Sequence, residues 1–318
     1  MAKQKLQRKI STFQAVSINM SQMMGAGPFI TIPLVISAMN GPQAIFGWIV
    51  GAILALLDGQ IWSELGSAIP GEGGTYNFFK AAFQHKTGNL MPFLFIWSVL
   101  LATPLTMSSG AIGLAQYVKY LIPSLTQLQI KFIAAGVSIL TILLLYHKIT
   151  NVTKISVVLW AGMIITVVLI IGTGLFHFNP QLAFSFPKNA FSPGRFIAGL
   201  GAGMLLSIYD YLGYYTSAYM GDEVKRPGKT IPKAISLSII LVACIDLLMN
   251  IGIIGHIPWQ TAEKSTNIGS LFMSQIWGRP AGILITLLII WTCFASVYTG
   301  LLGASRIPFN AARDGVFF

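Results

Sequence analysis

The run from about Phe13 to Met39 constrains the fold of this chain more than any other stretch. It is mostly apolar, carries no charged residue and is long enough to cross a bilayer. A spanning helix keeps its backbone hydrogen bonds unbroken, because hydrocarbon offers no replacement partner. Gly25, Gly27 and Pro28 nevertheless interrupt this run near its middle. The interruption has two interpretations: close helix packing with a kink, or an unwound segment that lines a polar cavity and binds a ligand.

The low charge content of the whole chain indicates the same environment. Of its 318 residues, 54% are hydrophobic and 9% are charged, and the mean hydropathy is +0.72. A soluble domain carries about 25% charged residues, so we expect an all-α polytopic membrane protein embedded in a lipid bilayer. The net charge of +11 does not indicate a nucleic acid partner, because the basic residues are scattered between the apolar runs. Cys244 and Cys293 lie inside apolar runs and the four histidines are scattered, so no disulfide, metal or cofactor is predicted.

Eight apolar segments are predicted to form the spans of a single transmembrane domain covering residues 1–318. Their ranges are about 13–39, 42–67, 91–121, 128–147, 153–176, 195–220, 232–256 and 271–305. With the N-terminus in the cytoplasm, fourteen of the 20 Lys and Arg residues lie on the inner side and six on the outer side. This asymmetry favours a cytoplasmic N-terminus. We expect a multi-pass protein of the plasma membrane.

The sixth predicted span contains a second interruption, at Gly213. Ser207 and Asp210 precede it, and an ionised Asp at mid-bilayer costs about 2.5–3.5 kcal/mol. Asp210 should therefore face a cavity or a partner, as a substrate contact or as a support of the fold. Interruptions in two spans five apart are typical of inverted-repeat secondary transporters, and the odd offset reverses the orientation as such a repeat requires. The pairing favours the ligand-binding interpretation of both breaks.

Four sequence stretches at these positions resemble the amino acid–polyamine–organocation (APC) superfamily of permeases. They are Met24-Gly-Ala-Gly-Pro-Phe, Glu64-Leu-Gly-x-x-x-Pro-Gly-x-Gly-Gly-x-Tyr, Glu223-Val-Lys-Arg-Pro-Gly-Lys-Thr-Ile-Pro-Lys-Ala and Ser305-Arg-Ile-Pro-x-x-Ala-Ala-Arg-Asp-Gly. They follow the order and the topological positions of that family, and the likeness covers the whole chain. The resemblance implies a LeuT-type inverted-repeat transporter fold with discontinuous spans one and six. Family members usually continue for four more spans, so the second repeat is expected to be incomplete here.

The resemblance also implies a substrate site between the two broken spans. The N–H groups of Gly25, Ala26 and Gly27 would hold a substrate carboxylate, as unwound N–H groups and a helix N-terminus can. Carbonyl groups between Ser207 and Tyr211 would accept from the substrate ammonium, and Tyr209 matches an aromatic gate. Pro28 departs from the Ile or Val that is usual in the family. The full predicted set is Gly25, Ala26, Gly27, Ser207, Tyr209, Asp210 and Gly213.

A coupling ion, H⁺ or Na⁺, is a further expectation. Ser296 and Thr299 share one helical face in the eighth span, where relatives with sodium sites place hydroxyl ligands; such hydroxyls also commonly bond to the preceding turn. Nothing ionisable lies between Ile155 and Ile171, so the proton-carrying lysine that some family members have in span five is absent. Asp58 and Asp246 are interpreted as structural acids.

The predicted function is therefore secondary active transport of amino acids across the membrane by alternating access. Three alternatives remain open: transport of a polyamine or another cationic amine, a non-transporting sensor, and an inactive remnant. No acid–base pair, activated nucleophile or metal cluster indicates an enzyme. A homodimer is a further hypothesis.

Overall fold

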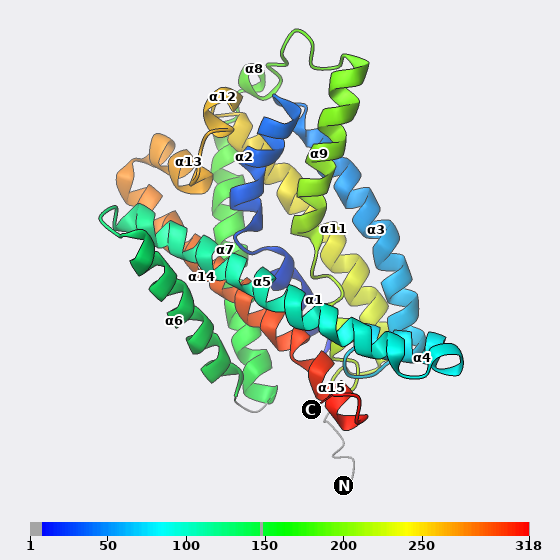
Figure 1. Cartoon of the computed structure of the whole chain (residues 1–318). Coiled ribbons are helices and arrows are strands. Elements are labelled where there is room, and N and C mark those ends of the chain that lie inside the picture. The colour runs from blue at the N-terminus through cyan, green and yellow to red at the C-terminus, as the bar shows by residue number, and fades with distance from the viewer. Residues whose placement is uncertain (1–7, 147–148, 318) are drawn as a thin grey trace.

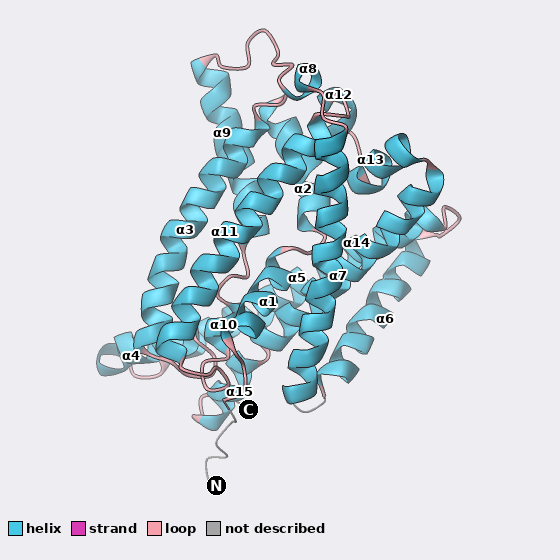
Figure 2. Cartoon of the chain, turned by 180° about the vertical axis from the view of Figure 1, so that it is seen from behind, coloured by secondary structure: helices cyan, strands magenta, loops and turns pink. Residues whose placement is uncertain are grey.

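The computed structural model describes residues 8–146 and 149–317, and its chain is built from α-helices (Figures 1 and 2). Apart from two isolated bridges, the described residues form no strand. The predicted domain also includes residues 1–7, 147–148 and 318, which lie outside the described residues. The helices are α1 (Thr12–Met23), α2 (Gly27–Met39), α3 (Ala44–Ala68), α4 (Thr75–Thr87), α5 (Leu90–Leu121), α6 (Gln127–Leu145), α7 (Ile149–Phe176), α8 (Pro180–Ala183), α9 (Pro193–Tyr211), α10 (Thr216–Tyr219), α11 (Pro227–Ile254), α12 (Trp259–Ala262), α13 (Ile268–Trp277), α14 (Arg279–Ala304) and α15 (Arg306–Arg313).

Six of the described helices are long and apolar enough to cross a bilayer: α3, α5, α6, α7, α11, and α14 with its continuation α15. The bent pair α1 and α2 makes a seventh if it counts as one span. Helix α9, in the sixth predicted span, is not among them, yet it runs alongside α3 through the body of the molecule (Figure 1). The predicted segment 271–305 is divided, since α13 ends at Trp277 and α14 begins at Arg279. Gly278 separates them with a φ of 83°, a backbone conformation that favours glycine.

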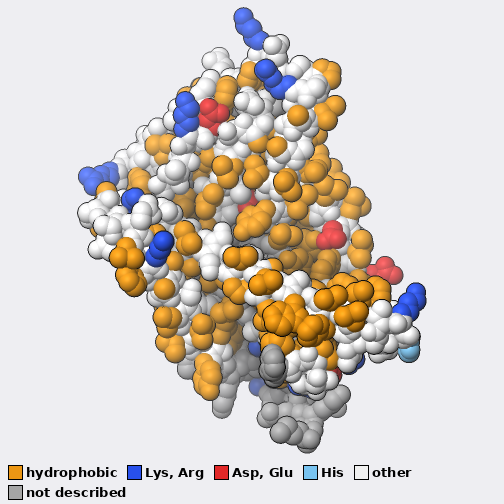
Figure 3. Space-filling view, viewed as in Figure 1, with side chains coloured by type: hydrophobic (Ala, Val, Ile, Leu, Met, Phe, Trp, Pro, Cys, Tyr) orange, Lys and Arg blue, Asp and Glu red, His pale blue; other side chains and the backbone are white. Residues whose placement is uncertain are grey.

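The side chains are distributed as expected for a protein surrounded by lipid. Large apolar side chains point outward along the long helices, and Leu57, Leu105 and Leu205 are each more than 60% exposed. Figure 3 shows hydrophobic side chains over much of the middle of one face and most Lys and Arg side chains toward its margins. Many of the fully buried side chains are instead small and polar, such as Ser21, Ser207 and Thr292. Such residues let membrane helices approach closely and bond to one another.

The predicted break in the first span is present. Helix α1 ends at Met23, α2 begins at Gly27, and the two helices are bent by 48°. Pro28 lies in the first turn of α2, where an absent N–H costs no hydrogen bond and the fixed φ suits a helix. Proline in place of the usual Ile or Val therefore favours the start of α2, the second half of the span.

The predicted break in the sixth span is also present. Helix α9 ends at Tyr211, and the single-turn helix α10 begins at Thr216. Gly213 lies between them with a φ of 123°, which is open to glycine and strained for other residues. The local backbone therefore explains why a glycine interrupts this span.

Two ends of the molecule can be distinguished in Figure 1. Helices α8 and α12 lie at one end, which we call the α8 end. Helices α4, α10 and α15 lie toward the other, which we call the α15 end. The two breaks lie between these ends, and α5 crosses beside the first of them.

Candidate functional site

The two helix breaks touch each other. A Cβ atom added to Gly213 would lie 2.3 Å from Cγ of Gln22, the penultimate residue of α1. It would also lie 3.3 Å from the backbone carbon of Gln22. The two interruptions, about 190 residues apart in the sequence, therefore form one site in space.

A pair of hydrogen bonds holds the second break against α1. The Asn19 side chain donates from Nδ2 to Oγ of Ser217 at 3.1 Å, and Oδ1 accepts from the Ser217 backbone N–H at 2.9 Å. Both side chains are buried. Neither residue belongs to the predicted set; the signal for Asn19 in the sequence is an amide side chain within an uncharged apolar run. This pair fixes α10 beside α1.

Asp210 reaches across from α9 to the start of α2. Its Oδ2 accepts from Oγ1 of Thr31, which also donates to the Gly27 carbonyl at 2.9 Å. A Cβ added to Gly27 would lie 2.2 Å from Oδ1 of Asp210. That oxygen is buried and receives no hydrogen bond from the described residues. Asp210 therefore leaves one free acceptor facing the N-terminal end of α2.

The break also leaves backbone donors and acceptors available. Among the described residues, Gly25 and Ala26 donate no backbone hydrogen bond, and Gly27 as the first residue of α2 has no partner within that helix. The opposite polarity is found at the end of α9, whose last carbonyl groups have no partner within the helix. The N-terminus of α2 and the C-terminus of α9 thus present partial positive and partial negative charge to one place.

Two of the predicted substrate residues, Ser207 and Tyr209, have surroundings that differ from those of Asp210 and Gly213. The Ser207 hydroxyl is buried and donates to the Gly47 carbonyl of α3 at 2.9 Å, so it joins α9 to α3. Tyr209 is 46% exposed. Asp210 and Gly213 are the residues of the second break that lie against the first. Which face of α9 would meet α2 depends on the rotation of the helix, which the sequence does not give.

Ser296 of α14 lies against the first break. Its Oγ donates to the Gln22 carbonyl at 3.0 Å, and a Cβ added to Gly25 would lie 2.6 Å from that Oγ. Thr299 instead donates to the Ala295 carbonyl of its own helix at 2.8 Å. The structure therefore brings one of the two predicted hydroxyls, together with a carbonyl oxygen, to the break.

Cavities lie on both sides of the break. One of about 290 Å³ lies toward the α15 end, between α5, α10 and α14, with Gln22, Thr216 and Gly300 in its lining. Another of about 400 Å³ lies toward the α8 end, between α2, α5 and the segment before α13, with Pro33 and Tyr117 in its lining. Helix α5 borders both, and between them Gly113 approaches Ala26 so closely that an added Cβ would lie 3.0 Å from the alanine Cβ.

The remaining acids in the spans have different surroundings. Asp58 accepts a hydrogen bond from the hydroxyl of Tyr214, which supports its interpretation as a structural acid. Asp246 of α11 is fully buried, and neither of its carboxylate oxygens receives a hydrogen bond from the described residues. Asn250, one helical turn further along, is also buried, and neither Nδ2 nor Oδ1 of its side chain forms a hydrogen bond with the described residues.

Comparison with known proteins agrees with this architecture. A family model described as amino acid permease matches residues 10–318. The chain belongs to the amino acid permease family. This membership confirms the resemblance to APC permeases and the interpretation of the chain as a multi-pass membrane permease rather than an enzyme.

Curated relatives of this permease are named as amino acid transporters. The human cystine/glutamate transporter is 25% identical over 98% of this chain and 62% of its own length. The aspartate-proton symporter of Bacillus subtilis (strain 168) is 27% identical, with 98% and 62% covered. The mouse large neutral amino acids transporter small subunit 2 is 26% identical, with 98% and 59% covered. The chain thus spans about three fifths of the length of the curated relatives it matches.

Proposed function

We propose that this permease transports amino acids by alternating access, with the substrate bound between the two helix breaks. The observation that carries the proposal is the opposed helix ends at that place. An amino acid is a zwitterion, so its carboxylate suits the N–H groups of Gly25, Ala26 and Gly27 at the start of α2. Its ammonium group suits the carbonyl groups at the end of α9, although that of Tyr209 already accepts the Leu212 N–H. The names of the relatives support the same substrate class.

Alternating access requires a route from the site to each side of the membrane. The cavities toward the α8 and α15 ends support such routes, since α5 separates them at the contact of Gly113 with Ala26. In this proposal the two broken spans belong to an inverted-repeat fold. The α15 end faces the cytoplasm, as the distribution of basic residues favours, and the membrane is the plasma membrane. A homodimer stays a prediction.

Asp210 favours a second candidate substrate, a cationic amine. Its free oxygen lies beside Gly27, where an amino acid carboxylate would bind, so an ionised Asp210 would repel that carboxylate. A substrate with a second ammonium group would instead gain a charge-assisted hydrogen bond. A neutral, protonated Asp210 would remove the conflict and admit an amino acid.

The coupling ion, Na⁺ or H⁺, is part of the proposal. The Ser296 hydroxyl and the Gln22 carbonyl supply two oxygen ligands of the kind that a sodium ion takes. A proton on Asp210 is the alternative, because it would permit the substrate carboxylate to bind.

Transport by the purified chain in proteoliposomes tests the proposal. Labelled amino acids and diamines are offered under a sodium gradient, a proton gradient, or neither. We expect uptake of amino acids that one of the two gradients accelerates. Uptake of diamines alone would favour the cationic amine, and binding without any uptake would support the sensor.

A further inference from the structure

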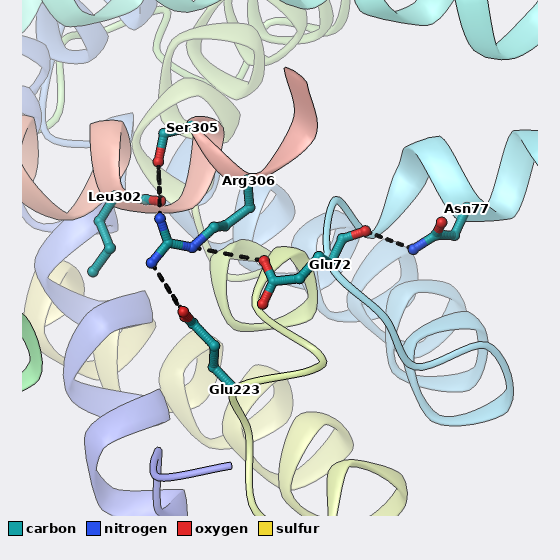
Figure 4. A network of polar contacts seen from close by, with 6 residues as sticks. All are labelled: Glu72, Asn77, Glu223, Leu302, Ser305 and Arg306. Carbon is teal, nitrogen blue, oxygen red and sulfur yellow. Dashed lines mark hydrogen bonds and ion pairs between the residues drawn. The ribbon is translucent and has the colours of Figure 1, made fainter. Parts of the chain in front are cut away.

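Three charged side chains meet at the α15 end (Figure 4), and two of them, Glu72 and Glu223, lie in loops outside the spanning segments. Glu72 comes from the loop after α3, Glu223 from the loop before α11, and Arg306 from the start of α15. We call these three side chains the Arg306 cluster. Arg306 Nη2 lies 3.1 and 3.3 Å from the two carboxylate oxygens of Glu223, and its Nε lies 3.6 Å from Oε2 of Glu72. Two carboxylates therefore share one guanidinium group.

Glu72 has the less favourable position of the two acids. Its side chain is fully buried, and neither carboxylate oxygen receives a hydrogen bond from the described residues. Within the described part of the chain, the Glu72 oxygen that accepts a hydrogen bond is its backbone carbonyl, from Nδ2 of Asn77 at 2.6 Å. Glu223 in contrast accepts from Arg306 with both oxygens. A buried carboxylate without a donor is more stable as the neutral acid.

The charges around the cluster assign the proton to Glu72. Burial raises the pKa of Glu72 to about 9, and the negative charges of Glu223 and Asp222 contribute to this rise, while Arg306 and Arg313 oppose it. Burial also raises the pKa of Glu223, and its ion pair and hydrogen bonds with Arg306 offset only part of this rise. The two hydrogen bonds from Arg306 therefore place the negative charge on Glu223 and the proton on Glu72, whose oxygens accept none from the described residues.

A polar cavity lies next to the loop of Glu72 at this end. This cavity of about 400 Å³ has Glu72 in its lining, together with Asp222 and Arg313. Lys80 and Asp314, also in its lining, form an ion pair of 2.6 Å with each other. The cavity therefore brings polar and charged side chains close to the loop of Glu72, while the carboxylate itself is buried in the closed arrangement.

The Arg306 cluster joins segments that must separate if this end opens. The backbone N–H of Gly73 donates to the Tyr219 carbonyl at 2.8 Å, which fastens the loop of Glu72 to the end of α10. The N–H of Ile10, just before α1, donates to the Glu223 carbonyl at 2.9 Å. Tyr219 and Ile307 also line the 290 Å³ cavity below the helix breaks. Separation of these loops would therefore connect that cavity with the α15 end.

We propose that Glu72 is a proton-binding site that holds the α15 end of the transporter closed. A proton from the cytoplasm neutralises the carboxylate of Glu72, leaves one carboxylate facing one guanidinium group, and thereby favours the closed arrangement. When the loops separate, water reaches Glu72, its O–H bond ionises, and the proton returns to the cytoplasm. The proposal rests on the proposed function, because it takes this end as cytoplasmic and as one of two gates.

The direction of the pH dependence follows from these states. The pKa of about 9 in the closed arrangement lies above the ordinary value of 4.5, so closing takes up a proton. The contribution of this proton to the closed state is complete below pH 4.5 and is lost as the pH rises through about 9. Between these limits the ratio of closed to open molecules falls about tenfold per pH unit. It should fall about a hundredfold between about pH 6 and about pH 8.

Distance measurement between two spin labels tests the proposal without substrate. The labels are attached at Lys86→Cys at the end of α4 and Lys229→Cys in the first turn of α11, in a Cys244→Ser background. Both lysines are exposed and lie outside the cluster. Electron–electron double resonance then gives the fractions of short and long distances in membranes at each pH. We expect short distances to dominate at low pH. The ratio of short to long distances should then fall about a hundredfold between about pH 6 and about pH 8.

Two substitutions identify the titrating group. Glu72→Gln, a neutral replacement, should make the distances independent of pH, whereas Glu64→Gln, at an exposed acid on α3, should leave the dependence unchanged. If Glu72→Gln does not fold, Glu223→Gln is the second test. Glu72 then loses the neighbouring negative charge and pairs alone with Arg306, so its pKa falls and the dependence should shift to lower pH than in the wild type.

Three results would overturn the proposal. They are a wild-type distribution that does not change between about pH 6 and about pH 8, a wild-type dependence retained by Glu72→Gln, and the same dependence retained by Glu223→Gln. Uptake is measured separately. Failed uptake with a pH-dependent distance would refute the proposed function and leave the proton site in place.

Discussion

Gly27→Ala should weaken substrate binding severely while the protein still folds. The added methyl group would lie 2.2 Å from Oδ1 of Asp210, whereas ordinary contact begins near 3.4 Å. The Asp210 carboxylate or the start of α2 must therefore move by about 1 Å. A displacement of that size at a binding site costs about a hundredfold in rate or affinity. Alanine is a better helix former than glycine by about 1 kcal/mol, so α2 itself should not be destabilised.

The measurement is equilibrium binding of a labelled amino acid to purified protein, with the yield of monodisperse protein recorded separately. Gly201→Ala on α9 is the matched control, because its added Cβ would meet nothing within 4 Å. If the overlap with Asp210 is the cause, Gly27→Ala should cost little more when added to Asp210→Ala. Unchanged affinity in Gly27→Ala, or equal losses in Gly27→Ala and Gly201→Ala, would refute this reasoning.

Three further predictions concern Asp210, Asn19 and the orientation. Asp210→Asn should weaken a cationic substrate about ten- to hundredfold more than a neutral one in competition binding; equal losses would make Asp210 a structural residue. Asn19→Ala leaves the buried Ser217 N–H without its acceptor, and should lower the thermal unfolding midpoint through a loss of about 1–3 kcal/mol. An unchanged midpoint would mean that α10 is held by other contacts. Lys188→Cys should react with an impermeant thiol reagent in intact cells, since Lys188 lies exposed in the loop after α8; labelling only after permeabilisation would reverse the orientation.

The two breaks could be predicted from sequence because each has a local cause. Pro28 lacks an N–H, and Gly213 adopts a φ that other residues avoid, so both leave a mark in the sequence itself. The division between α13 and α14 at Gly278 also has a local signal in the sequence. This signal is Pro280, which lies in the first turn of α14. The division escaped the prediction because the apolar run continues on both sides of it.

The contacts between distant segments could not be predicted in the same way. Asn19 and Ser217 are 198 residues apart, and only the packing of α10 against α1 brings them together. The orientation of Ser207 toward α3 depends on the rotation of α9 about its axis. Glu72, Glu223 and Arg306 lie in three of the four stretches that carry the family resemblance, but their sequence positions give no sign that they form one cluster.

Helix α10 connects the proposed substrate site with the Arg306 cluster. Asn19 holds its second residue, Ser217, against α1, and its last residue, Tyr219, accepts the hydrogen bond from Gly73. The four residues of α10 span about 6 Å as a helix, which is too short to bend smoothly. A shift of α1 on substrate binding would therefore move the Tyr219 carbonyl and the loop that carries Glu223. Because the same short element is fastened at both ends, protonation of Glu72 and occupation of the site should influence each other, and by linkage they must do so equally.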